Sequence, residues 1–238
     1  MKLREFKILT FDVVGTLIDF EAGILDYVRP IAQRAGVQLD DETILHSYGK
    51  AEGIEHERTP GLPFPPMMAP AYRTMAAELG LPADEATVEG FRLSIPAWPA
   101  FPDTVEALKR LRKRYRLVAM TNSDNWALGH FARTMEQPFD DMVTAEDVGT
   151  CKPDPQFFAY ARGRQSSHGY KLEDYLHVAQ SQYHDIGVAK RLGYRTCWIE
   201  RRMGKEGFGG SPAPAVMTEP DYHFESLVKL ADAVDREE

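Results

Sequence analysis

FDVVGTLIDF (residues 11–20) overlaps the apolar run KILTF (7–11) and places an acid, Asp12, at the point where that run ends. A short apolar run bounded by turn residues is typical of a strand buried in a parallel sheet. Gly15 and Thr16 supply the turn here. An acid that caps such a turn is ordinary by itself, so the meaning of Asp12 depends on the residues at the ends of the other strands.

Apolar runs alternate with amphipathic segments along most of the chain. From residue 100 onward helices and strands follow one another in turn, which is the pattern of a parallel sheet covered by helices on both faces. The further strands are expected at 116–121, 142–146, 175–180 and 195–200, and the helices at 103–114, 125–135, 154–163 and 184–192. The sequence therefore predicts an α/β fold with a doubly wound parallel sheet.

The segment between the first two strands differs from the rest, because it contains only helix-like patterns such as EAGILDYVRPIAQRAG (21–36). A helical insertion after the first strand is the simplest account. Its hinges are expected at Gly15-Thr16 and at the proline-rich IPAWPAFPD (95–103). We therefore expect a catalytic core of residues 1–16 plus 100–238 and a helical cap of residues 17–99.

Composition narrows the class of protein. The chain has 238 residues, 43% of them hydrophobic, which is enough for one large domain with a smaller one inserted. Its net charge of −8 and its short basic runs argue against nucleic acid as a partner. No apolar window reaches the length of a membrane span and no cleavable leader is evident, so we expect a cytoplasmic protein. Cys151 and Cys197 lack any partner pattern and are interpreted as buried free thiols.

Polar residues follow the predicted strands and should meet at one edge of the sheet, because ligands of open parallel sheets bind outside the carboxyl ends of the strands. These residues are Asp12, the run Thr121-Asn122-Ser123, Lys152, the run Gln180-Ser181-Gln182, and Asp185. A nucleophilic carboxylate needs such surroundings: a nearby cation, hydrogen-bond donors for the substrate, and a second acid or amide to place a water.

Four motifs at these positions resemble those of the haloacid dehalogenase superfamily. They are FDVVGT (11–16), MTNS (120–123), CKPDP (151–155) and VAQSQYHDIGVAKRLGYRTCWIERR (178–202), in the superfamily's order and at compatible spacings. The resemblance covers essentially the whole chain, helical cap included. It implies a Rossmann-like core, a helical cap, and Asp12 as the nucleophile.

Two positions favour one branch of that superfamily. Phosphatases normally carry a second acid two residues after the nucleophile, where this chain has Val14. They also carry an acidic pair in the fourth motif, and here Gln180 and Ser181 stand where the first acid should fall and only Asp185 remains. Valine cannot donate a proton to a leaving group, and magnesium prefers several oxygen ligands. The sequence instead resembles the type II 2-haloacid dehalogenases.

That resemblance implies a hydrolase that displaces a leaving group from a small anionic 2-substituted acid without a metal. Asp12 would form an ester, Lys152 would lower the pKa of both Asp12 and Asp185, and Asp185 would orient or deprotonate water. The residues expected to bind substrate are Thr16, Thr121, Asn122 and Ser181. A homodimer is compatible with this interpretation. The alternatives are a phosphatase with Mg²⁺ at Asp12 and Asp185, and a member with lost or altered activity.

One departure from the dehalogenases concerns the cap. Those enzymes typically carry an arginine in the second cap helix that stabilises the departing halide, and the corresponding stretch ILHSYGKAEGIEHE (44–57) has none. An ungapped comparison places Ser47 or Tyr48 at that position. The sequence leaves open whether His46, Lys50 or Arg58 takes its place or whether the substrate releases no halide.

Overall fold

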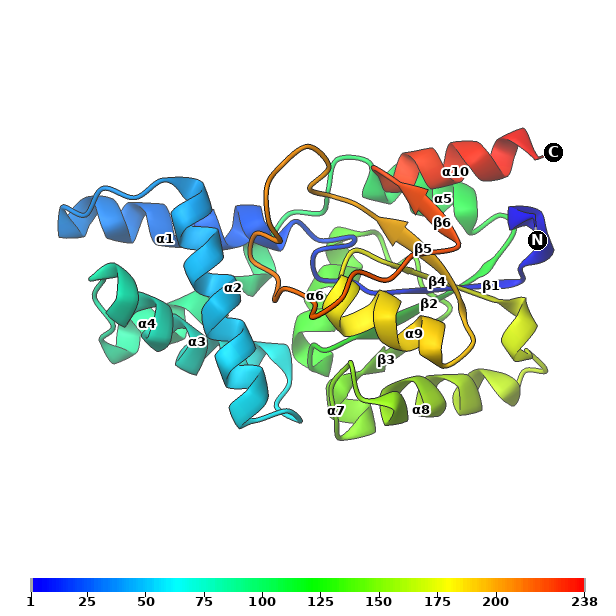
Figure 1. Cartoon of the computed structure of the whole chain (residues 1–238), viewed down its shortest axis with the longest axis horizontal. Helices are drawn as coiled ribbons and strands as arrows, with labels where there is room; N and C mark the ends of the chain where they lie inside the picture. Colours follow the sequence, from blue (N-terminus) through cyan, green and yellow to red (C-terminus); the bar gives the residue numbers. More distant parts are fainter. Residues whose placement is uncertain (1, 238) are drawn as a thin grey trace.

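The computed structural model describes residues 2–237 and has a six-stranded sheet at its centre (Figure 1). All the strands are parallel and their order is β3-β2-β1-β4-β5-β6. They are β1 (Ile8–Phe11), β2 (Arg116–Thr121), β3 (Asp141–Thr144), β4 (Tyr175–Ala179), β5 (Arg195–Ile199) and β6 (Tyr222–Phe224). The predicted α/β fold with a doubly wound parallel sheet is confirmed.

The strand that the sequence did not indicate is β6, at the edge of the sheet. It has only three residues, Tyr222, His223 and Phe224, and none of them is fully buried. A strand this short shows no repeated alternation of apolar and polar residues, so its pattern cannot be told from that of a loop.

Helices cover both faces of the sheet. They are α5 (Thr104–Leu111), α6 (Asn125–Thr134), α7 (Ala145–Val148), α8 (Pro155–Ser166), α9 (Gly187–Arg191) and α10 (Leu227–Arg236), with single turns η1 (Leu3–Glu5), η3 (Leu172–Asp174) and η4 (Gln182–Ile186). Neighbouring strand residues point to opposite faces. Leu9 accordingly packs with α5, α6 and α10, whereas Ile8 packs with α8 and α9. The two cysteines are free and buried, as expected.

The segment between β1 and β2 is helical and lies at the opposite end of the molecule from both chain ends (Figure 1). Its elements are α1 (Phe20–Ala35), α2 (Asp41–Arg58), α3 (Phe64–Leu79), α4 (Glu85–Leu93) and the turn η2 (Ile95–Ala97). Asp19, Asp40 and Asp84 accept hydrogen bonds from the first turns of α1, α2 and α4, which satisfies backbone groups that a helix start leaves free. The boundaries at 16/17 and 99/100 remain a prediction.

A buried arginine joins the two parts. Arg202, which follows β5, donates hydrogen bonds to Glu21 of α1 at 2.7 Å and to Glu42 of α2 at 2.5 Å. Glu21 also accepts a hydrogen bond from the backbone N–H of Gly210 at 3.0 Å. The glycine-rich loop at 204–215 is thereby held against the cap, although its composition indicates a flexible segment.

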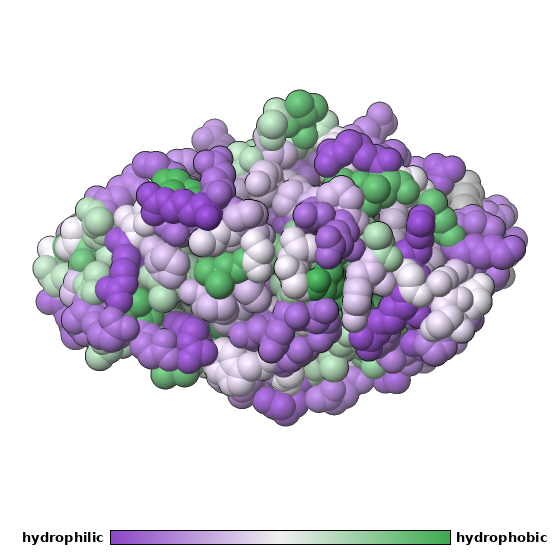
Figure 2. All heavy atoms as spheres, turned by 90° about the horizontal axis from the view of Figure 1, so that it is seen from below, coloured by the Kyte–Doolittle hydropathy of each residue, from purple (hydrophilic) through white to green (hydrophobic). Residues whose placement is uncertain are grey.

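The outer surface is mostly polar. On the face that Figure 2 shows, apolar residues are scattered among polar ones and do not gather in one large patch. Within residues 2–237, no helix combines the length and the apolar character that crossing a membrane would require.

Candidate active site

Asp12 lies at the centre of the sheet, where the chain leaves β1 between β2 and β4. Its backbone N–H donates to the carbonyl of Val178 at 3.1 Å, which continues the ladder between β1 and β4 by one residue. The chain then turns at Gly15, whose φ of +87° is unfavourable for any residue with a Cβ. This turn brings the Thr16 hydroxyl back to donate to Asp12 Oδ2 at 2.7 Å.

Lys152 lies beneath Asp12 with 1% of its surface exposed. Its Nζ donates to Asp12 Oδ1 at 2.9 Å, to Asp185 Oδ1 at 2.6 Å and to the Met120 carbonyl at 2.8 Å. These three acceptors use all three protons of the ammonium group. The structure therefore brings together Asp12, Lys152 and Asp185, which the sequence places 140 and 33 residues apart.

His177 was not singled out from the sequence. Its Nε2 lies 3.0 Å from Asp185 Oδ1 and its Nδ1 lies 2.9 Å from the Thr10 hydroxyl. His177 lies inside the apolar strand YLHVA, so in the sequence it looks like any buried strand residue. One of its partners, Thr10, becomes evident only when the neighbouring strand β1 is placed beside it. We refer to Asp12, Lys152, Asp185 and His177 as the Lys152 cluster.

The two carboxylates of this cluster respond differently to burial. Burial favours the neutral acid at both positions, but at Asp185 the charge of Lys152 and the hydrogen bond with His177 outweigh it and lower the pKa to about 2. At Asp12 burial prevails over Lys152, and the charge of Asp185 acts in the same direction, so the pKa is raised. Lys152 thus acts on both pKa values in the expected direction, but at Asp12 burial outweighs its effect.

Asp12 and Lys152 open onto a cavity of about 40 Å³, which has room for a few water molecules. Its lining from the core is completed by Val14, Thr121, Asn122, Ser123, Gln180, Ser181, His184 and Ser211. Thr16 and Asp185 are fully buried and do not line it. Thr16 instead joins Asp12 to the backbone N–H of Gln180, from which it accepts a hydrogen bond at 2.8 Å.

The other residues that the sequence assigned to substrate do line the cavity, and each also supports the site. The Asn122 side chain accepts from the Lys152 N–H at 2.7 Å and donates to the Lys152 carbonyl at 2.9 Å. The Thr121 hydroxyl donates to Ser123 at 3.1 Å. Ser181 accepts the His184 N–H at 2.9 Å, which caps the turn η4.

The cap closes the cavity with Phe20, Phe64 and Glu52. The Glu52 carboxyl group is buried near Asp12, and burial together with that negative charge raises its pKa to about 8. Val14 faces the same space. The cap side of the cavity thus presents two rings and a carboxyl group, and sequence motifs gave no signal for Glu52.

No arginine of the described residues lines this cavity. The residues considered as replacements lie elsewhere: Ser47 and Lys50 bond to Glu78, Arg58 pairs with Glu55, Tyr48 packs against Phe91, and His46 is exposed. The residues of α2 that reach the cavity and its edge are instead Glu52, which lines it, and His56, which contacts His184.

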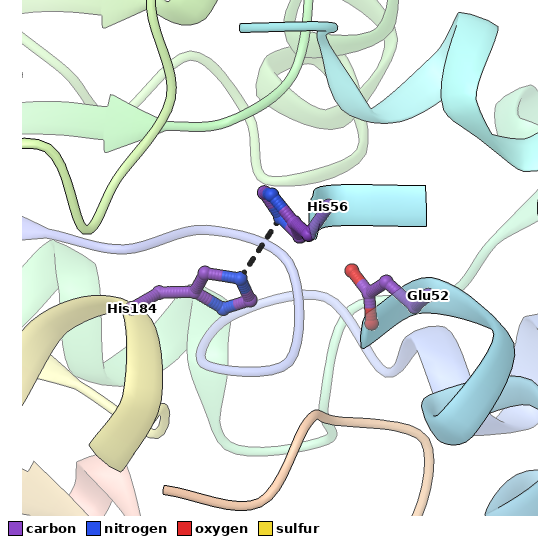
Figure 3. A group of neighbouring side chains, drawn as sticks. All are labelled: Glu52, His56 and His184. Carbon is purple, nitrogen blue, oxygen red and sulfur yellow. Dashed lines mark hydrogen bonds between the residues drawn. The ribbon is translucent and has the colours of Figure 1, made fainter. Parts of the chain in front are cut away.

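His56 and His184 meet directly across the boundary between cap and core (Figure 3). Their Nε2 atoms are 3.0 Å apart, so one ring donates its N–H to the other. His184 also lines the cavity. His56 was not singled out, because its neighbour is 128 residues away in the chain.

The residues fit magnesium poorly. Lys152 Nζ lies within hydrogen-bond distance of both Asp12 and Asp185 and so takes the place of a cation between them. Asp185 Oδ2 is buried without a hydrogen-bond partner among the described residues, but Val14 and Ser181 add no anionic oxygen near it. Magnesium needs near-octahedral oxygen coordination, and this donor set is too small for it.

Comparison with known proteins agrees with this geometry. The family of haloacid dehalogenase-like hydrolases matches residues 6–193. An (S)-2-haloacid dehalogenase of Pseudomonas fluorescens is 28% identical over 137 residues, and the match covers 56% of this chain and 59% of that protein. The chain thus spans less than two thirds of that relative's length.

Two further proteins resemble this chain, one in sequence and one in structure. A glyceraldehyde 3-phosphate phosphatase of Methanocaldococcus jannaschii is 33% identical over 96 residues, which cover 40% of this chain and 38% of that protein. The structure of L-2-haloacid dehalogenase from Xanthobacter autotrophicus superposes with a TM-score of 0.77 at 17% identity, covering 97% of this chain and 99% of that one. At that identity the likeness establishes the fold alone.

Proposed function

The chain belongs to the haloacid dehalogenase-like hydrolases, and from this premise we propose that it displaces a leaving group from a small 2-substituted carboxylic acid through an ester on Asp12. The observation that carries the proposal is the contact between Asp12 and Lys152 on the cavity wall. Asp12 opens onto the cavity with Lys152 bonded to it, while Val14 stands where a phosphatase would need its second acid. The names of the dehalogenase relatives support the same choice.

The first step is a displacement at carbon. A carboxylate oxygen of Asp12 attacks the carbon that bears the leaving group, a carbon–oxygen bond forms, and the leaving group departs with the bonding electron pair. Each carboxylate oxygen has two lone pairs, so the bonds from Lys152 and Thr16 still leave one free. These two bonds fix the orientation of the carboxylate, and orientation accounts for a large share of such rate enhancements.

The second step is hydrolysis of the ester. Water attacks the Asp12 carbonyl carbon, the hydroxy acid leaves with an oxygen that came from Asp12, and the carboxylate is restored with one oxygen from water. We propose Thr121, Asn122 and Ser181 as the groups that contact substrate, since they line the cavity. We assign Thr16 and Asp185 to positioning Asp12 and Lys152, because both are buried behind the cavity wall.

An isotope experiment tests this route. A single turnover of 2-chloropropionate in ¹⁸O-labelled water, with enzyme in excess, should place label in the peptide that contains Asp12 and leave the first product unlabelled. Label that appears directly in the product would mean that water attacks carbon and would contradict the ester.

The phosphatase remains the competing function, since a glyceraldehyde 3-phosphate phosphatase is among the relatives. A phosphatase would release phosphate from an aryl phosphate. It would lose this activity in the presence of a chelator and regain it when magnesium is added. We expect no such release at a rate comparable with halide release, because Val14 cannot protonate the leaving oxygen.

A further inference from the structure

Three side chains that can bind metal ions lie where the cap meets the core. Glu52 and His56 come from α2, and His184 comes from the turn η4 (Figure 3). One ligand atom from each lies within 4.8 Å of the other two. We refer to these three residues as the histidine cluster.

Local structure holds the two rings and the carboxylate in place. Glu52 and His56 are four residues apart on α2 and so lie on the same face of the helix. His184 Nδ1 is 3.2 Å from the Ser181 hydroxyl, which leaves its Nε2 directed at His56. Histidines that bind metals commonly have their second nitrogen fixed by a hydrogen bond in this way.

Glu52 lacks a partner. Glu52 is only 6% exposed. Among residues 2–237, the structure shows no hydrogen bond or ion pair to its carboxyl group. Figure 3 shows the carboxyl group turned toward the two rings. Buried carboxylates are commonly paired or bound to metal ions, and this carboxyl group, which borders the cavity, is free to bind a cation.

The two imidazoles are in the form that binds metals. Burial lowers the pKa of His56 and lowers that of His184 still further, with the neighbouring ring adding to the effect at His184. A hydrogen bond between the two Nε2 atoms also requires that one of them be unprotonated, and an unprotonated imidazole nitrogen offers a lone pair to a metal ion.

We propose that Glu52, His56 and His184 bind one divalent transition-metal ion of the zinc type, which joins cap helix α2 to the core. Two imidazoles and one carboxylate suit zinc, whereas magnesium and calcium prefer oxygen ligands alone. Zinc–nitrogen bonds of about 2.0–2.1 Å in a tetrahedron place ligand atoms about 3.3 Å apart. The 3.0 Å between the two Nε2 atoms is close to that spacing.

Three protein ligands leave one position of a tetrahedral ion for water or another oxygen ligand. Glu52 and His184 also line the cavity, so that position borders the space in front of Asp12. The ion adds positive charge to a wall to which α2 contributes the carboxyl group of Glu52. The inference does not depend on the proposed reaction, because metal binding is measured without substrate.

Equilibrium dialysis of the full-length, tag-free protein against zinc tests the site. We expect one zinc ion per chain, and binding weakened by at least about 10-fold in Glu52→Gln, His56→Ala and His184→Ala. His46→Ala and Glu57→Gln are matched controls on α2, because both residues are exposed and lie outside the cluster. These two should bind zinc like the unaltered protein.

Thermal unfolding of the unaltered protein gives a second measurement that needs no variant. Zinc at about 100 times its dissociation constant should raise the unfolding midpoint by about 5–10 °C, whereas magnesium should not. Absence of stoichiometric zinc binding, or binding that the His56→Ala/His184→Ala double variant retains, would overturn the proposal. The contact between the rings would then be a hydrogen bond between cap and core and nothing more.

Discussion

The two sides of the cavity differ in how their charged groups are balanced. In the Lys152 cluster every proton of the ammonium group has an acceptor, and both carboxylates contact the same lysine. In the histidine cluster a buried carboxyl group faces two neutral rings and makes no hydrogen bond that the described residues record. On the first side the lysine is fully paired, although Asp185 Oδ2 beside it is buried without a hydrogen-bond partner among residues 2–237. The other side is arranged as if for a ligand.

This difference indicates a division of tasks. In the Lys152 cluster, Asp12 directly follows the central strand β1 and His177 lies in its neighbour β4, where the sheet fixes backbone positions. Lys152 and Asp185 are bonded to these residues from the segments after β3 and β4. The histidine cluster forms only where a cap helix meets a core turn, so its geometry depends on how the cap is seated. The proposed reaction is therefore assigned to the side that the sheet fixes, which we call the rigid side, and the proposed metal site to the side that depends on the cap.

The largest effect is expected on the rigid side, from Asp12→Asn. Replacing the proposed nucleophile should reduce halide release from 2-chloropropionate by at least about 10³-fold, since an amide cannot form the ester. Halide release is measured beside thermal unfolding, with His46→Ala as a control that should keep full activity. Turnover of the variant within about 10-fold of that of the unaltered protein would show that Asp12 is not the nucleophile.

The next effect concerns charge balance in the Lys152 cluster. Lys152→Met leaves two carboxylates buried without their cation, and we expect the free energy of unfolding to fall by about 3–5 kcal/mol. Urea unfolding measures it. The double variant Asp12→Asn/Lys152→Met removes one of the two unpaired carboxylates and should recover part of the lost free energy of unfolding. A loss in the double variant equal to the sum of the losses in Lys152→Met and Asp12→Asn would show that the two residues are not coupled.

A pH series tests whether the cap side is really unbalanced. The folded protein keeps a proton on Glu52 up to about pH 8, whereas the unfolded chain loses it near the ordinary pKa of 4.5. Stability attributable to Glu52 therefore falls as pH rises between these values, by up to about 1.4 kcal/mol per pH unit.

Glu52→Gln has no such proton to lose. In the presence of a chelator its free energy of unfolding should rise relative to that of the unaltered protein as the pH increases from 5 to 8. Glu57→Gln, an exposed neighbour on the same helix, should follow the unaltered protein. Parallel curves for Glu52→Gln and the unaltered protein would mean that Glu52 has a partner after all.

The smallest effect separates positioning from substrate binding on the rigid side. Thr16→Val deletes the hydroxyl that joins Asp12 to the Gln180 N–H, at a cost of about 1–3 kcal/mol in stability. We expect kcat to fall and KM to change little, with Thr16→Ser close to normal. A raised KM with unchanged kcat would instead return Thr16 to the substrate contacts that the sequence indicates.

Sequence reasoning succeeded for residues whose position follows from the strand pattern. Asp12, Lys152 and Asp185 each lie in a segment after a predicted strand, and parallel strands bring such segments to one edge. The same reasoning cannot separate a residue that faces the cavity from one that lies behind it. Thr16 and Asp185 were expected to contact substrate or water, and burial places both behind the wall.

Residues of the histidine cluster escaped prediction for a different reason. Glu52 and His56 occupy a helix whose polar residues are spread around it, so no motif distinguishes them from solvated positions. Their significance appears only when the end of α2 is placed against η4. His177 was missed because it is a single polar residue in an apolar strand, and the short β6 because three residues show no period.

The backbone N–H of Asp12 is bonded to the carbonyl of Val178, within the ladder of the central strands. Amide protons in such positions exchange with solvent only when a large part of the structure opens, whereas those near loops and element ends exchange through small local fluctuations. The position of the reactive carboxylate is therefore as durable as the sheet itself. Sequence changes in the cap can alter what the cavity admits while the attacking group stays where it is.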